Sequence, residues 1–193
     1  MPNGTTNSGY DYVANILNQA SYGVTQVVKD GAGTLVPKAA PNYEGLWRVK
    51  AGVVDVQVDN AFGKLLAAPD ETKKLTVDDG ARVTLPKTNT SLNSKYVEMA
   101  GGVSSGDSGV LYSTADYTIS GARFKLTGDA QLYDKNGTCS VGGGTIDVAG
   151  HKFYAAGGMY VNGNYQSNLV VTNSDATTPG RFVAPWSNEY KAH

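Results

Sequence analysis

Short runs of alternating apolar and polar residues, separated by glycine- and asparagine-rich turns, recur along most of the 193-residue chain. In the clearest run, Val53–Val58, the side chains of Val54, Val56 and Val58 share one side, which is the period of two that a half-buried strand requires. Turn signals follow one another about every 8–12 residues, a spacing typical of sandwiches and barrels. The pattern predicts a mainly β fold, an antiparallel sandwich or barrel with one short N-terminal helix and extended terminal arms.

Pairs of these runs flank turn signals such as Asp78-Asp79-Gly80 and Asn162-Gly163 and therefore predict antiparallel hairpins. The predicted hairpins join residues 72–77 to 81–85, 130–133 to 138–141, 145–148 to 152–156, and 159–161 to 165. Strand and helix patterns do not alternate, which disfavours a parallel α/β sheet. No repeat of fixed period is visible, which argues against a propeller or a solenoid.

The same patterns divide the chain into three parts. Residues 1–22 form an N-terminal arm with a short helix, residues 23–172 a β body, and residues 173–193 a C-terminal arm. The body contains one polar stretch, residues 86–94, with few apolar side chains. That stretch is either a long loop within one domain or a linker between two β units.

Apolar residues in the two arms predict contact with a partner. Tyr12, Ile16 and Leu17 lie on one side of the expected helix, which is too short to be stable alone in water. Trp186 and Tyr190 lie in the non-periodic C-terminal arm, where a large aromatic side chain needs a pocket to fill. We therefore expect Tyr12, Ile16, Leu17, Trp186 and Tyr190 to form interfaces.

Charge and composition disfavour several classes of partner. The formal net charge is −1 and the 16 basic residues are scattered, so we expect no nucleic-acid partner. No apolar run approaches the roughly 20 residues of a membrane span, so we expect no membrane partner. No signal peptide is visible at the start, which predicts synthesis in the cytoplasm or an already trimmed chain. Cys139 is the only cysteine and is expected to be packed and inert.

Two serine motifs suggest hydrolases, and neither is supported by its surroundings. Gly106-Asp107-Ser108-Gly109 is similar to the nucleophile loop of chymotrypsin-like proteases, but the general base of that family precedes its serine. Here both histidines, His151 and His193, follow Ser108. The stretch 102–106 fits the G-x-S-x-G pattern, which needs a strand-to-helix turn that the sequence does not predict.

We therefore predict no catalytic, cofactor-binding or metal-binding residues and no enzymatic activity. The two histidines and one cysteine are too far apart in sequence to suggest a metal site. A hydrolase on a β scaffold is the third choice of function. It would require His151 within hydrogen-bonding reach of Ser104 or Ser108.

The short polar N-terminal arm, the turn-dense β body, the low charge, the lack of paired cysteines and the C-terminal arm with Trp186 together resemble capsid decoration, or cement, proteins of tailed phages. The resemblance implies a virion protein made in the host cytoplasm that bridges and stabilises capsid subunits. It also implies a homo-oligomer, a trimer by preference, that binds a major capsid protein or another virion subunit. The alternative is a carbohydrate- or receptor-binding module of a tail fibre or spike. The 12 tyrosines suit such a surface, and exposed, co-facial Tyr or Trp side chains would favour it.

Overall fold

The computed structural model describes residues 25–87, 89–104, 107–161, 170–172 and 181–183. The predicted N-terminal helix and all five predicted interface residues lie outside these ranges. The strands are β1 (Gln26–Lys29), β2 (Thr34–Leu35), β3 (Leu46–Val49), β4 (Gly52–Asp55), β5 (Leu75–Val77), β6 (Ala81–Leu85), β7 (Tyr96–Gly101), β8 (Leu111–Ser113), β9 (Tyr117–Ser120), β10 (Arg123–Gly142), β11 (Thr145–Asp147), β12 (Lys152–Val161), β13 (Val170–Thr172) and β14 (Arg181–Val183). One 3-10 turn, η2 (Glu71–Lys73), precedes β5.

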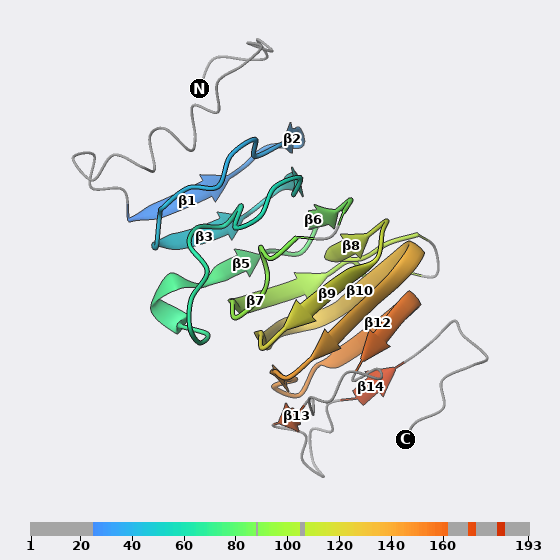
Figure 1. The fold of residues 1–193 in the computed structure, drawn as a ribbon. Helices are drawn as coiled ribbons and strands as arrows, with labels where there is room; N and C mark the ends of the chain where they lie inside the picture. The colour runs from blue at the N-terminus through green and yellow to red at the C-terminus, as the bar shows by residue number, and fades with distance from the viewer. Residues whose placement is uncertain (1–24, 88, 105–106, 162–169, 173–180, 184–193) are drawn as a thin grey trace.

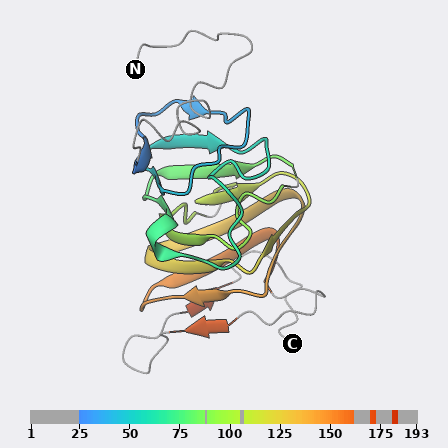
Figure 2. The ribbon, with the colours of Figure 1, turned by 60° about the vertical axis from the view of Figure 1, so that its left-hand side comes forward.

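The strands stack in parallel as successive coils of a β-solenoid (Figures 1 and 2). β1, β3, β5 and β7 form one ladder, β2, β4, β6 and β8 form a second, and both ladders join β10. Each pass of the chain contributes one strand to each ladder before the next coil begins. The predicted antiparallel sandwich or barrel is therefore wrong, because the strands pair in parallel and their order is an open path.

The expectation against a solenoid is also wrong, and uneven coil length is the reason. Trp47, Leu75, Val97, Phe124 and Ile146 occupy the same position in successive coils of the first ladder. They are separated by 28, 22, 27 and 22 residues. A search for a fixed period does not find a repeat whose coils differ in length through their connections.

The predicted hairpins are corners or continuous strands. β5 pairs with β3 and β7, whereas β6 pairs with β4 and β8, so Asp78-Asp79-Gly80 joins two ladders of one coil. Residues 130–133 and 138–141 both belong to β10, and β11 and β12 each pair with β10 rather than with each other. Tyr165 lies outside the described residues. Gly80 adopts a left-handed φ of 80°, a conformation that serves a corner as well as a hairpin.

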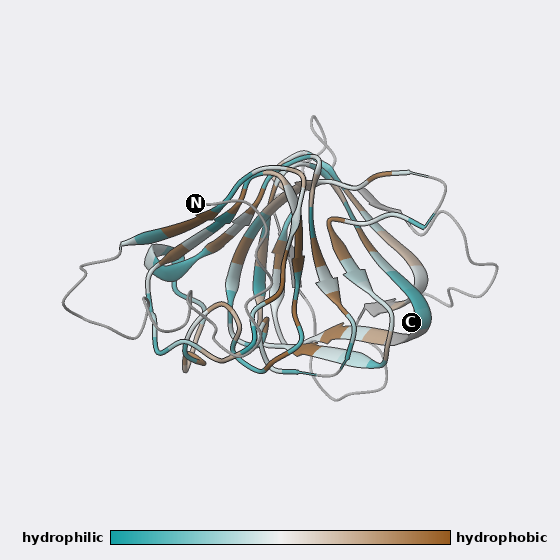
Figure 3. Ribbon diagram, turned by 90° about the horizontal axis from the view of Figure 1, so that it is seen from above, coloured by the Kyte–Doolittle hydropathy of each residue, from teal (hydrophilic) through white to brown (hydrophobic). Residues whose placement is uncertain are grey.

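Apolar and polar residues alternate along the strands (Figure 3), and the apolar rows are buried in the interior. The inward rows are Trp47, Leu75, Val97, Phe124 and Ile146; Val49, Val77, Met99 and Leu126; Val54, Val83, Leu111, Leu132 and Ala155; and Tyr117, Cys139 and Met159. Each of these side chains is at most 2% exposed. Cys139 is thus packed in the interior, as predicted, and burial raises the pKa of its thiol.

The polar stretch before β7 is bonded to the body through buried groups. Asn89 Nδ2 donates to the Val56 carbonyl at 3.3 Å, and the Tyr117 hydroxyl donates to Asn89 Oδ1 at 2.9 Å. At the end of the stretch, Lys95 is 4% exposed and its Nζ donates to the Phe62 carbonyl at 3.2 Å. These bonds satisfy polar groups that lie between the apolar rows.

Candidate binding face

One connection between the two ladders is much longer than its equivalents in neighbouring coils. Residues 50–51 join β3 to β4 and residues 78–80 join β5 to β6, whereas residues 102–110 join β7 to β8. We call residues 102–110 the corner loop; positions 105–106 within it lie outside the described residues. Both serine motifs of the sequence fall in this loop. Insertions between stacked repeats are common sites of binding function.

Glycines fix the corner loop against the body. Gly102 has a left-handed φ of 69°, and a Cβ there would run into the Val110 amide nitrogen, so the two ends of the loop touch. A Cβ on Gly109 would lie 2.9 Å from the Tyr133 Cβ. The loop therefore leaves and rejoins the coil at one point and crosses closely over β10.

Three alternate residues of β10, which belongs to the next coil, bond to the corner loop. Gln131, which is fully buried, donates from Nε2 to the Ser108 carbonyl at 2.5 Å. The Tyr133 hydroxyl donates to Asp107 Oδ1 at 2.6 Å, and Lys135 Nζ lies 2.7 Å from Asp107 Oδ2. Because residues two apart on a strand share a face, these three side chains present one continuous outward edge to the loop.

The charges of this cluster support one another at neutral pH. Hydrogen bonds from Lys135 and Tyr133 lower the pKa of Asp107, so its carboxylate is ionised. The bond to Asp107 raises the pKa of Tyr133 to about 12 and that of Lys135 above its ordinary value. The phenol therefore keeps its proton and the amine keeps its charge, which are the states that hold the loop.

An aromatic stack continues from this cluster toward earlier coils. Tyr112 of β8 pairs in register with Tyr133, and their rings stack with centroids 5.6 Å apart and planes inclined by 13°. The Arg82 guanidinium of β6 lies 4.6 Å from the Tyr112 ring centroid. We call Arg82, Tyr112, Tyr133, Asp107 and Lys135 the lateral array. The array spans three successive coils and the corner loop.

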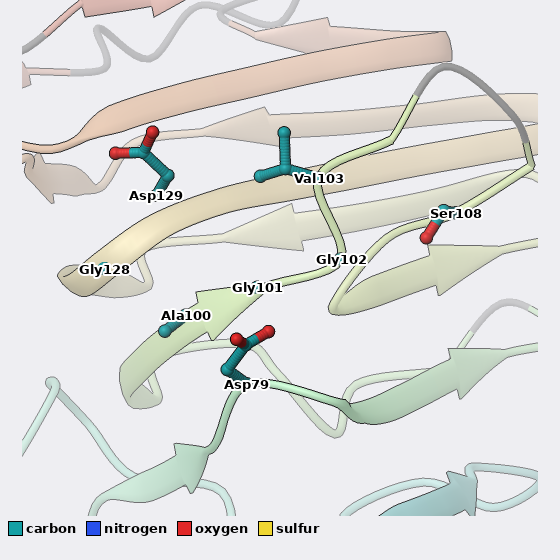
Figure 4. Close-up of a pocket in the computed structure, with 8 residues that line it drawn as sticks. All are labelled: Asp79, Ala100, Gly101, Gly102, Val103, Ser108, Gly128 and Asp129. Atoms are coloured by element: carbon teal, nitrogen blue, oxygen red, sulfur yellow. The ribbon is translucent and has the colours of Figure 1, made fainter.

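A shallow pocket of about 380 Å³ opens where the corner loop leaves the coil (Figure 4). Its lining residues are Asp79, Ala100, Gly101, Gly102, Val103, Ser108, Gly128 and Asp129. Asp79 lies in the corner between β5 and β6, and Asp129 lies within β10, where its register with β7 shifts. Val103 reaches over the pocket from the loop and is 41% exposed. The pocket lining thus combines two carboxylates, three glycines, one serine and two apolar side chains.

The residues of the hydrolase alternative are distributed around this region without forming a triad. Ser108 lines the pocket, whereas Ser104 and His151 are not among its lining residues. His151 Nδ1 lies 3.9 Å from Asp129 Oδ1, which also accepts from the Lys152 amide at 2.9 Å. Within the described ranges, no hydrogen bond links Ser108 to His151. Nor do those ranges bring three His, Cys, Asp or Glu side chains together as metal ligands.

The sequence indicated the loop but missed the residues that hold it. Tyr112 and Tyr133 appeared only among the many tyrosines, and Arg82, Gln131 and Lys135 carried no local motif. The available signal was the spacing of Gln131, Tyr133 and Lys135, which marks one face of a strand. No helix in the described part of the chain has the length and apolar character needed to cross a membrane.

The chain folds as a parallel β-solenoid, and the corner loop is an insertion held in place by side chains of β10. No protein-family model and no solved structure matches the chain. The chain is similar to the adhesin BmaC autotransporter of Brucella suis biovar 1 (strain 1330), with 29% identity over 151 residues. The match covers 75% of this chain and 4% of the adhesin, so the chain spans only a small part of that protein's length.

Proposed function

We propose that this chain is a binding segment of a β-solenoid surface protein, and that the corner loop and lateral array form its contact surface. The observation that carries the proposal is the fastening of the loop by Gln131, Tyr133 and Lys135. A long loop without function would cost conformational entropy to order. A loop held in one conformation before binding loses less entropy on contact and so binds more tightly.

The surrounding surface supports recognition of a partner. Tyr and Arg side chains are enriched where interfaces carry most of their binding energy. Tyr112 and Tyr133 are co-facial, the feature that favours the carbohydrate- or receptor-binding alternative, although Tyr112 is largely covered. The similarity to an adhesin supports the same class of function. No described feature favours capsid decoration, which stays a prediction.

The test is an attachment assay with a loop-shortened variant. Beads coated with the 193-residue chain are presented to fixed cells, extracellular-matrix proteins and immobilised glycans. In the variant, residues 102–110 are replaced by the short corner sequence Asp-Asp-Gly of residues 78–80. We expect the wild type to attach to at least one surface and the variant to lose most of that attachment, with circular dichroism unchanged.

A control on the opposite ladder separates the contact surface from general stickiness. Lys125→Ala changes an outward-facing residue of the first ladder, away from the corner loop. This variant should attach as the wild type does. Equal attachment by the loop-shortened variant, or no attachment by the wild type to any of the three surfaces, would refute the proposed function.

A further inference from the structure

Arg82 lies against an aromatic ring at one end of the lateral array. It lies on the outward face of β6, and its guanidinium packs on the ring of Tyr112. Tyr112 is only 8% exposed and is supported on its other side by Tyr133. A guanidinium stacked on an aromatic ring keeps its N–H groups at its edge, where they remain open to a ligand.

The N–H groups of Arg82 have no hydrogen-bond acceptor among the described residues. Arg48 differs, because its guanidinium pairs with Asp78 at 2.8 Å. Arg123 stacks on Tyr96 at 5.3 Å but lies on the other ladder, away from the corner loop. In the described ranges, no hydrogen bond or ion pair reaches the Arg82 guanidinium. The Arg82 guanidinium is thus a planar donor beside the proposed contact surface.

No ion pair among the described residues neutralises Arg82 directly. Asp107 is paired with Lys135, so these two cancel. Asp55, on the coil before Arg82, accepts from Gln57 Nε2 at 2.7 Å, and no ion pair joins it to Arg82. Arg82 is thus a cation outside any ion pair of the described residues, which suits an anionic ligand.

We infer that Arg82 binds the carboxylate of an acidic sugar in a glycan, an inference that rests on the proposed function. A guanidinium edge matches a carboxylate with two parallel hydrogen bonds. Thr84 lies on the same face of β6, and its hydroxyl suits a sugar hydroxyl. Tyr112 is too covered to stack on a sugar ring, so its role is to position Arg82.

The test compares three ligands on the full 193-residue chain by surface plasmon resonance. They are a hexuronic-acid oligosaccharide, the same oligosaccharide with methyl-esterified carboxyls, and a sulfated neutral oligosaccharide of equal length. We expect the acid to bind, the ester to lose binding, and the sulfated ligand to bind more weakly. Raising the salt concentration should also weaken binding of the acidic oligosaccharide, because the contact is with an exposed charge.

Three variants assign the binding to Arg82. Arg82→Gln should weaken acid binding about 10- to 100-fold, the range for hydrogen bonds to a charged group. Arg82→Lys keeps the charge but loses the planar edge, so it should recover only part of that loss. Arg123→Gln removes the matched ring-stacked arginine and should bind as the wild type does. Thermal unfolding of each variant shows whether the fold is intact.

The outcomes separate the inference from the proposed function. Equal binding of acid and ester, tighter binding of the sulfated ligand, or an unchanged Arg82→Gln variant would overturn the carboxylate assignment. If the uronic acid does not bind while the bead assay still depends on the corner loop, the inference fails and the proposed function stands. If loop-dependent attachment is also absent, both fail.

Discussion

Replacing the buried Lys95 by methionine should stabilise the protein. Lys95 is 4% exposed, and its amine has one bond, to the Phe62 carbonyl. Burial lowers the pKa of this amine from 10.5 to about 8, while Glu44 and Lys73 act on it in opposite directions. At pH 7 the folded protein must therefore keep a charge in a site that disfavours it.

The size of the effect follows from the two pKa values. Each pKa unit corresponds to about 1.4 kcal/mol, so the buried charge costs up to about 3 kcal/mol below pH 8. The unfolded chain binds more protons than the folded chain between about pH 8 and 10.5, so stability rises with pH across that window. Methionine has a similar length and removes the charge. It leaves the Phe62 carbonyl without its hydrogen bond, which destabilises the fold by about 1 kcal/mol or more. The expected net gain at pH 7 is about 1–2 kcal/mol.

Urea denaturation followed by tryptophan fluorescence measures this gain. Trp47 is buried in the same interior and reports unfolding. The difference in unfolding free energy between Lys95→Met and the wild type should be largest below pH 8 and should shrink toward pH 10.5. Lys152→Met, at an exposed position, is the control and should change little. A less stable Lys95→Met variant, or a difference that does not depend on pH, would refute this account of the buried amine.

Three further changes test the loop and the interior. Tyr133→Phe removes the hydroxyl that donates to Asp107. The free energy of unfolding should fall by about 1 kcal/mol, and the pKa of Asp107 measured by NMR should rise. An unchanged pKa would contradict a hydrogen bond that holds the corner loop. Gly102→Ala adds a Cβ to a left-handed, crowded position and should lower the melting temperature more than Gly80→Ala, which is left-handed but open; equal losses would refute the crowding. Phe124→Ala empties a fully buried position and should cost about 3–5 kcal/mol in urea denaturation, whereas a loss below 1 kcal/mol would place Phe124 outside the core.

Strand positions could be predicted from the sequence, but strand partners could not. The alternation around Val54 indicated a half-buried strand, and β4 lies there with Val54 fully buried. Its partner in β6 is Val83, a whole coil away. A turn such as Asp78-Asp79-Gly80 favours a left-handed residue in a corner and in a hairpin alike. The local signal therefore could not decide between an antiparallel meander and a parallel solenoid.

Only the part of the candidate site that is local in sequence could be predicted. The glycines and serines of the corner loop formed motifs because the loop is local in sequence. Asp107 is held by Tyr133 and Lys135, and these two lie on the following coil. In a parallel solenoid, stacking brings each outward residue beside its counterpart one coil away, and coil length varies. A site on such a fold is specified by register, so its residues emerge only once the in-register pairs, such as Tyr112 with Tyr133, are known.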